Sequence, residues 1–208
     1  MNTPEAATLE INLNGYTDLP PGKIANVVTF LERTPPAEPP PRDPSATIRR
    51  VEQPGLDWYR DLYRRIGEDW LWFSMAVMPD DKLAAILDAP GTAILVSERN
   101  GQATGLAELD FAKPGAVEIV MFGVVPEETG KGTAHALMNA ALAETMRPGI
   151  ARVWLHTCTF DHPAAVRFYR RNGFRAFKFA IEVSDDPRLS GHLRRDAAPH
   201  VPLIDPAG

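Results

Sequence analysis

Residues 116–134 read AVEIVMFGVVPEETGKGTA, and they combine a strand, a proline turn and the start of a helix. The apolar run up to Val125 predicts a buried strand. Pro126 ends it, because proline cannot donate to a central ladder. After Lys131, apolar residues recur at helical spacing. The small residues at 130–134 therefore lie at a helix N-terminus, where free N–H groups and the helix dipole favour a phosphate.

Two common phosphate motifs do not fit this turn. A P-loop requires Gly-Lys-Ser/Thr, whereas here Gly132 follows Lys131. A dinucleotide fingerprint requires a third small residue where His135 stands. An ordinary strand, turn and helix with two glycines is the simplest alternative interpretation.

A second strand, turn and helix occupies residues 151–174, ARVWLHTCTFDHPAAVRFYRRNGF. Pro163 suits a first helical position, with Asp161 or His162 before it as the cap. Gly173 is placed to end the helix in a left-handed conformation.

Together the two stretches resemble motifs A and B of the GNAT superfamily, the GCN-related N-acetyltransferases. Gly132 and Ala134 match the small positions of Arg/Gln-x-x-Gly-x-Gly/Ala, although Thr129 stands where Arg or Gln is usual. Tyr169, followed four residues later by Gly173-Phe174, resembles motif B. The resemblance implies an α/β (mixed α+β) fold with a central, mixed, mostly antiparallel twisted sheet flanked by helices. It also implies transfer of an acetyl group from acetyl-CoA to a primary amine.

Composition agrees with a cytoplasmic enzyme. The chain has 208 residues, 44% hydrophobic and 24% charged, as expected for one globular domain. It contains no apolar run of membrane-spanning length and no secretory signal at its start. The single Cys158 excludes an intramolecular disulfide and fits a reducing compartment. The net charge of −5 disfavours nucleic acid and is compatible with a cationic amine.

Proline content and hydrophobic pattern predict three segments. Residues 1–44 are predicted to form an N-terminal extension with a first strand at 23–33 and a proline-rich linker. Residues 45–184 are predicted to form the acetyltransferase domain. Residues 185–208 are predicted to form a loosely structured tail. Within the domain, helices are predicted at 56–66, 80–88, 131–146 and 163–172. Strands are predicted at 92–98, 103–111, 116–125, 151–160 and 174–183.

Acetyl transfer requires a neutral amine, and a lysine-like amine is neutral in only about 1 molecule in 2,500 at pH 7. A general base lowers this barrier of about 4.6 kcal/mol. Glu118 is the candidate, 11 residues before Thr129 as in the histone-acetyltransferase branch of the family. Strand alternation puts it on the face of Val120 and Phe122. A purely structural carboxylate is the alternative.

The resemblance assigns two further roles. Tyr169 serves as general acid at the departing coenzyme thiol, unless it only packs in the core. Coenzyme binding falls to Val124, Val125, Thr129, Gly130, Lys131, Gly132, Thr133, Ala134 and His162. For His162, a solvated helix cap is an equal alternative.

The acceptor site is predicted at Trp70, Trp72 and Phe73, which can form an aromatic pocket or belong to the core. The acceptor is a small-molecule amine or a protein amine, with no nucleic-acid or membrane partner. No metal is expected, because the alternation of His156 and Cys158 is that of an ordinary strand. A homodimer remains open, as does docking of a partner by the proline-rich arm. A non-catalytic acyl-CoA sensor is the alternative function that Thr129 leaves open.

Overall fold

The computed structural model describes residues 8–41, 43–44 and 46–206 of the chain. The strands are β1 (Lys23–Arg33), β2 (Thr47–Val51), β3 (Thr92–Arg99), β4 (Gln102–Asp110), β5 (Ala116–Val124), β6 (Arg152–Cys158) and β7 (Arg175–Asp185). The helices are α1 (Leu56–Gly67), α2 (Ser74–Val77), α3 (Asp80–Leu87), α4 (Thr133–Glu144) and α5 (Ala165–Arg171). Two 3-10 turns, η1 (Glu68–Trp70) and η2 (Pro126–Glu128), complete the elements.

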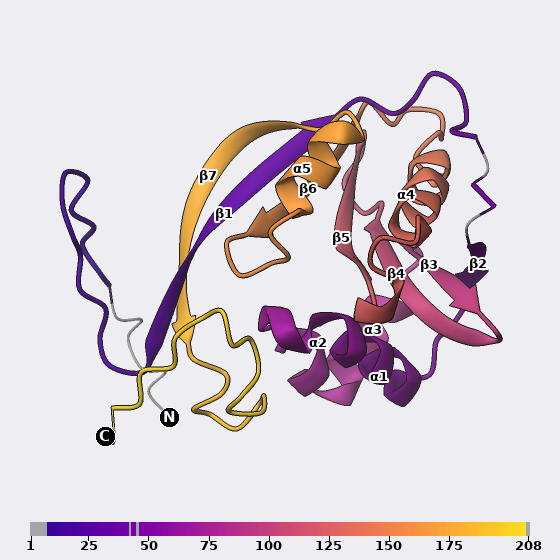
Figure 1. Cartoon of the computed structure of the whole chain (residues 1–208). Coiled ribbons are helices and arrows are strands. Elements are labelled where there is room, and N and C mark those ends of the chain that lie inside the picture. Colours follow the sequence, from indigo (N-terminus) through magenta and orange to yellow (C-terminus); the bar gives the residue numbers. More distant parts are fainter. Residues whose placement is uncertain (1–7, 42, 45, 207–208) are drawn as a thin grey trace.

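The seven strands form one sheet in the order β2-β3-β4-β5-β6-β1-β7. Every neighbouring pair is antiparallel except β5 and β6, which are parallel. Helices cover the sheet on both faces (Figure 1). The predicted mixed, mostly antiparallel α/β fold is therefore confirmed.

Helices α1 and α4 each bury an apolar stripe against the sheet. In α1 the buried residues are Tyr59, Leu62, Tyr63 and Ile66, whose spacing puts them on one helical face. They pack with Leu106 of β4 and other residues in one core cluster. Helix α4 covers the opposite face of β3–β5, and α5 covers the part of that face that belongs to β6 and β1.

Several elements differ from the prediction. The short β2 and α2 were not predicted, because four or five residues carry too little periodic signal. Helix α4 begins at Thr133 instead of 131, and α5 begins at Ala165 instead of 163. Strand β1 lies inside the sheet, between β6 and β7. The predicted boundaries at residues 44 and 184 stay predictions, but the sheet itself draws on residues before the first of them.

The C-terminal segment after β7 forms no helix or strand in its described part, residues 186–206, yet it is anchored. Arg188 and Asp186 form a buried ion pair at 2.7 Å. Burial pushes the pKa of Asp186 upward, but the hydrogen bonds from Arg188 outweigh it and the pKa is lowered. Leu193 packs in a cluster with Leu71, directly after η1. This segment therefore supports the turn that carries Trp70, a contact that its proline-rich composition does not predict.

No helix of the described residues is both long enough and apolar enough to cross a membrane. Those residues also contain no group of three or more His, Cys, Asp or Glu side chains that could hold a metal ion.

Candidate active site

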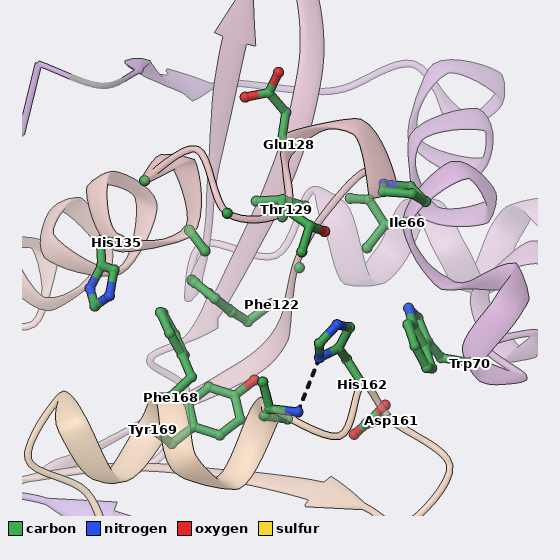
Figure 2. Close-up of a pocket in the computed structure, with 18 of the residues that line it drawn as sticks. Ile66, Trp70, Phe122, Glu128, Thr129, His135, Asp161, His162, Phe168 and Tyr169 are labelled. Atoms are coloured by element: carbon green, nitrogen blue, oxygen red, sulfur yellow. Dashed lines mark hydrogen bonds between the residues drawn. The ribbon is translucent and has the colours of Figure 1, made fainter.

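The sheet opens between β5 and β6. Their parallel pairing joins Ala116–Glu118 only to Arg152–Trp154. Toward the C-terminal ends of both strands, β5 remains paired with β4 as far as Val124, whereas β6 remains paired with β1 as far as Cys158. A cavity of about 640 Å³ lies where the strands have separated, lined by residues of β5, of the turn into α4, of α5 and of α1–η1 (Figure 2). Its volume is in the range of small-molecule sites.

One end of the cavity is bordered by the glycine turn before α4. Gly130 and Gly132 have φ values of +79° and +85°, a conformation that side chains with a Cβ rarely adopt. The Gly132 carbonyl accepts the first helical hydrogen bonds, from the N–H groups of His135 and Ala136. Gly130, Gly132 and Ala134 all line the cavity. The N-terminus of a twelve-residue helix thus meets the cavity, and its N–H groups and dipole favour an anion there.

Glu128 holds this turn in place, with only 3% of its side chain exposed. Its carboxylate accepts hydrogen bonds from Arg99 Nε at 2.7 Å, Arg99 Nη2 at 2.8 Å and the Thr133 hydroxyl at 2.5 Å. The hydrogen bonds from Arg99 and Thr133 lower the pKa of Glu128 to about 2. The carboxylate therefore ties the end of β3 to the first residue of α4.

Replacing Glu128 with glutamine is expected to lower the thermal midpoint by several degrees at pH 7, because charge-assisted hydrogen bonds are lost. The folded-state pKa lies below the ordinary value of 4.5, so the stabilisation is complete above pH 4.5 and disappears as the pH falls toward 2. Unfolding by urea between pH 7 and 3 should show the difference between wild type and variant shrinking below pH 4.5. The exposed neighbour Glu127, changed to glutamine, is the control. A difference that is constant over this range would contradict the assignment.

Tyr169 lies on the opposite wall, on α5. Its ring meets those of Phe122, Phe168 and Phe174 at centroid distances of 6.1, 5.6 and 6.1 Å. Figure 2 shows its hydroxyl pointing toward the middle of the cavity. Burial, and secondarily the charge of Asp161, raise the pKa of the phenol. Tyr169 is consequently a protonated hydrogen-bond donor at neutral pH.

The third wall contains Trp70, Trp72, Asp161 and His162. The Asp161 carboxylate accepts hydrogen bonds from Trp72 Nε1 at 2.9 Å, from the Thr157 hydroxyl at 2.6 Å and from the Cys158 amide at 3.0 Å. It thereby fixes the turn after η1 to the end of β6. His162 Nδ1 accepts the Ala164 amide at 3.0 Å, so this side chain caps the turn while its ring lines the cavity beside Trp70.

Glu118 lies at the base of the opening, as the last residue of β5 that pairs with β6. It does not line the cavity itself. Burial raises the pKa of its carboxyl, which Lys113 partly offsets and Asp110 reinforces. His156 Nδ1 is 3.8 Å from its Oε1. The half-buried carboxyl of Glu118, whose pKa is raised, is suited to act as a general base.

A bulge in β5 changes the predicted face of Glu118. The register with β4 joins Glu108 to Met121 and Leu109 to Ile119, which leaves Val120 as an extra residue. Phe122 consequently packs with Ile119 on the face of α4 and α5. Glu118 pairs with Trp154 on the other face. Glu118 and Phe122 do not share a face, because strict alternation fails at a bulge.

Comparison with known proteins decides the family. The model described as the acetyltransferase (GNAT) family matches residues 56–174, which is more than half of the chain. The chain belongs to the GNAT acetyltransferase family. It is thus an N-acetyltransferase of the GNAT type.

A relative agrees with this family, and solved structures share the fold. An uncharacterized N-acetyltransferase of Mycobacterium tuberculosis is 33% identical over 124 residues, 60% of this chain and 76% of the relative. A GCN5-related N-acetyltransferase from Sphaerobacter thermophilus shares the fold with a TM-score of 0.54 at 19% identity, over 77% of this chain and 52% of that one. An aminoglycoside acetyltransferase from a soil metagenome shares the fold with a TM-score of 0.52 at 16% identity. The match covers 62% of this chain and 88% of that one.

Most residues predicted for the GNAT site line the cavity: Trp70, Trp72, Val124, Thr129, Gly130, Gly132, Ala134, His162 and Tyr169. Besides Glu118, four others do not. Val125 is buried and its amide bonds to the Thr104 carbonyl. The side chains of Lys131 and Thr133 turn to Glu128 instead. Phe73 stacks on His192 of the C-terminal segment, at 5.8 Å between ring centroids.

Sequence reasoning did not identify Glu128 or the anchoring role of Asp161. The partner of Glu128, Arg99, is 29 residues away at the end of β3, and no periodic pattern links the two. The local sequence around Asp161 indicates a helix cap, whereas in this GNAT chain its carboxylate accepts a hydrogen bond from Trp72, 89 residues away in the sequence.

Proposed function

We propose that this GNAT enzyme transfers the acetyl group of acetyl-CoA to a primary amine by direct attack of the amine on the thioester. The observation that carries the proposal is the cavity in the opened sheet. A glycine turn at a helix N-terminus borders it on one side, and a buried phenol projects into it on another. The first feature suits a pyrophosphate and the second a departing thiolate.

The residues present fit the coenzyme. Small residues at 130, 132 and 134 leave room for phosphate oxygens beside the N–H groups of α4. Thr129 and Val124 border the same space, and His162 lies across it on the turn before α5. Acetyl-CoA supplies the acetyl group in activated thioester form.

Two side chains of the protein carry out the proton transfer and the hydrogen bonding that the reaction requires. Glu118, with its raised carboxyl pKa, accepts the proton of the acceptor ammonium through water, since it lies at the base of the opening and not in the cavity wall. Tyr169 donates a hydrogen bond to the sulfur as it departs. A covalent acetyl-cysteine is unfavourable, because burial raises the pKa of the Cys158 thiol to about 11 and keeps it protonated.

The acceptor enters beside Trp70 and Trp72. Indole faces attract cations, and the carboxylate of Asp161 adds negative charge to this wall of the cavity. A small-molecule amine or a protein amine with a cationic or apolar group next to the nitrogen fits these walls. A cytoplasmic location is part of the proposal and rests on the single cysteine.

The test is a calorimetric titration with acetyl-CoA, with acetyl phosphate as the control, followed by a screen of amine acceptors. Micromolar binding of acetyl-CoA and transfer to at least one amine are expected. Binding without transfer to a broad panel of amines would instead favour a non-catalytic acyl-CoA sensor, an alternative that Thr129 in the place of Arg or Gln supports. Absence of binding by folded protein would overturn the proposal.

Gly132→Ala should weaken acetyl-CoA binding at least about tenfold, because a Cβ at φ +85° strains the turn that aims the α4 amides. Gly149 is the matched control: its φ is +86°, no atom lies within 4 Å of a Cβ built there, and it does not line the cavity. Gly149→Ala should cost similar stability and leave the dissociation constant unchanged. Equal effects of both variants on binding would remove the turn from the coenzyme site.

A further inference from the structure

Strand β7 forms an open edge of the sheet, on the side away from β2 (Figure 1). Within the described residues its one strand partner is β1. Eleven residues long and free of proline, it exposes large apolar side chains: Phe179 is 70% exposed and Ile181 is 51% exposed. A long apolar edge of this kind is a template for pairing with another strand.

The exposed apolar side chains lie on one face. Phe179 pairs with Thr29 of β1, and Ile181 pairs with Val27. Leu31, two residues beyond Thr29, packs in the cluster that contains Tyr169 of α5. Because side chains alternate along a strand, Phe179, Ile181 and Val27 belong to the α5 face of the sheet, where they form an exposed stripe.

The two charges nearest the middle of β7, Lys178 and Glu182, fall on the other face, and both contact side chains of the neighbouring strand β1. Lys178 Nζ lies 4.5 Å from the centroid of the Phe30 ring. The Glu182 carboxylate accepts a hydrogen bond from Asn26 Nδ2 at 3.0 Å. These two charges of opposite sign are placed symmetrically about Ala180 in the sequence Lys-Phe-Ala-Ile-Glu.

This symmetry makes the edge complementary to itself. In an antiparallel pair of β7 strands with a twofold axis at Ala180, Lys178 of each copy lies opposite Glu182 of the other. In the same register Phe179 lies opposite Ile181. Cross-strand pairs of opposite charge and of large apolar residues both stabilise a sheet.

Other pairings lack this match. A twofold axis at Ile181 puts Lys178 opposite Ser184 and Glu182 opposite Ala180, so neither charge is paired. Parallel pairing in register puts Lys178 opposite Lys178, which is repulsive. The segment 178–182 also avoids the irregularity at Phe177, where the register with β1 shifts.

We propose that two copies of this chain associate through β7, antiparallel and centred on Ala180, so that their sheets become continuous. The interface is isologous, as expected for a symmetric dimer. It is separated from the active-site opening by β6 and β1, and it does not depend on the proposed acetyl transfer.

Charge reversal tests both the surface and its register. In sedimentation velocity, the wild type should dimerise in the micromolar range, whereas Lys178→Glu and Glu182→Lys should each raise the dissociation constant about tenfold or more. An equimolar mixture of the two variants should form a heterodimer, because every opposed pair is again of opposite sign. The double variant should dimerise like the wild type. Lys82→Glu, on the exposed surface of α3, is the matched charge control.

Circular dichroism of each variant separates loss of pairing from loss of fold. A wild type that stays monomeric at about 100 μM would overturn the proposal. So would a dimer that Lys178→Glu leaves intact, or well-folded single variants that fail to associate when mixed.

Discussion

Tyr169→Phe is expected to lower kcat by about 100-fold while the dissociation constant of acetyl-CoA changes less than about threefold. The substitution removes the one hydroxyl that α5 directs into the cavity and keeps the ring, which packs against Phe122 and Phe174. The loss therefore falls on stabilisation of the departing thiolate and leaves the binding surface unchanged. Steady-state rates with a responsive amine, together with calorimetry, measure the two quantities separately.

Tyr63→Phe is the matched control for this experiment. Tyr63 is also a buried phenol, but its hydroxyl lies 3.3 Å from Ser74 Oγ and its side chain does not line the cavity. We expect a modest loss of stability and an unchanged kcat. If Tyr169→Phe turned over as fast as the wild type, Tyr169 would have no role as a proton or hydrogen-bond donor.

Glu118→Gln is expected to lower kcat/KM by about 100-fold at pH 7, the lower range for loss of a general base. The carboxylate is the active form. Because burial raises its pKa, wild-type activity should fall on the acidic side with an apparent pKa above the ordinary 4.5. The variant should lack this acidic limb.

A second readout distinguishes a base from a structural carboxylate. As the pH approaches about 10.4, a lysine-like acceptor loses its own proton and the gap between wild type and variant should close. Glu32→Gln is the control, since Glu32 pairs with Trp154, the residue that also pairs with Glu118. A gap that stays constant with pH would assign Glu118 a structural role.

Local sequence patterns predicted the individual strands, turns and helices that depend on neighbouring residues. The apolar run of β5, the proline turn and the spacing of Ala134, Leu137 and Ala141 predicted one strand, turn and helix within two residues of the observed bounds. The left-handed conformation of Gly173 was predicted for the same reason, because few other residues adopt it at the end of a helix. Where a signal was short, as in β2, or where a bulge shifted the alternation, as at Val120, prediction from local pattern was incomplete or wrong.

By itself, the sequence determined the two strand-turn-helix units, their order and the family to which they belong. Only the tertiary structure decided how they make a site. The cavity exists because β5 and β6 separate after Glu118 and keep their other partners, β4 and β1. Its walls are fixed by Glu128 with Arg99 and by Asp161 with Trp72, pairs that are 29 and 89 residues apart. Hydrogen bonds of this kind depend on which side chains the fold brings within 3 Å, and a one-dimensional pattern does not carry that information.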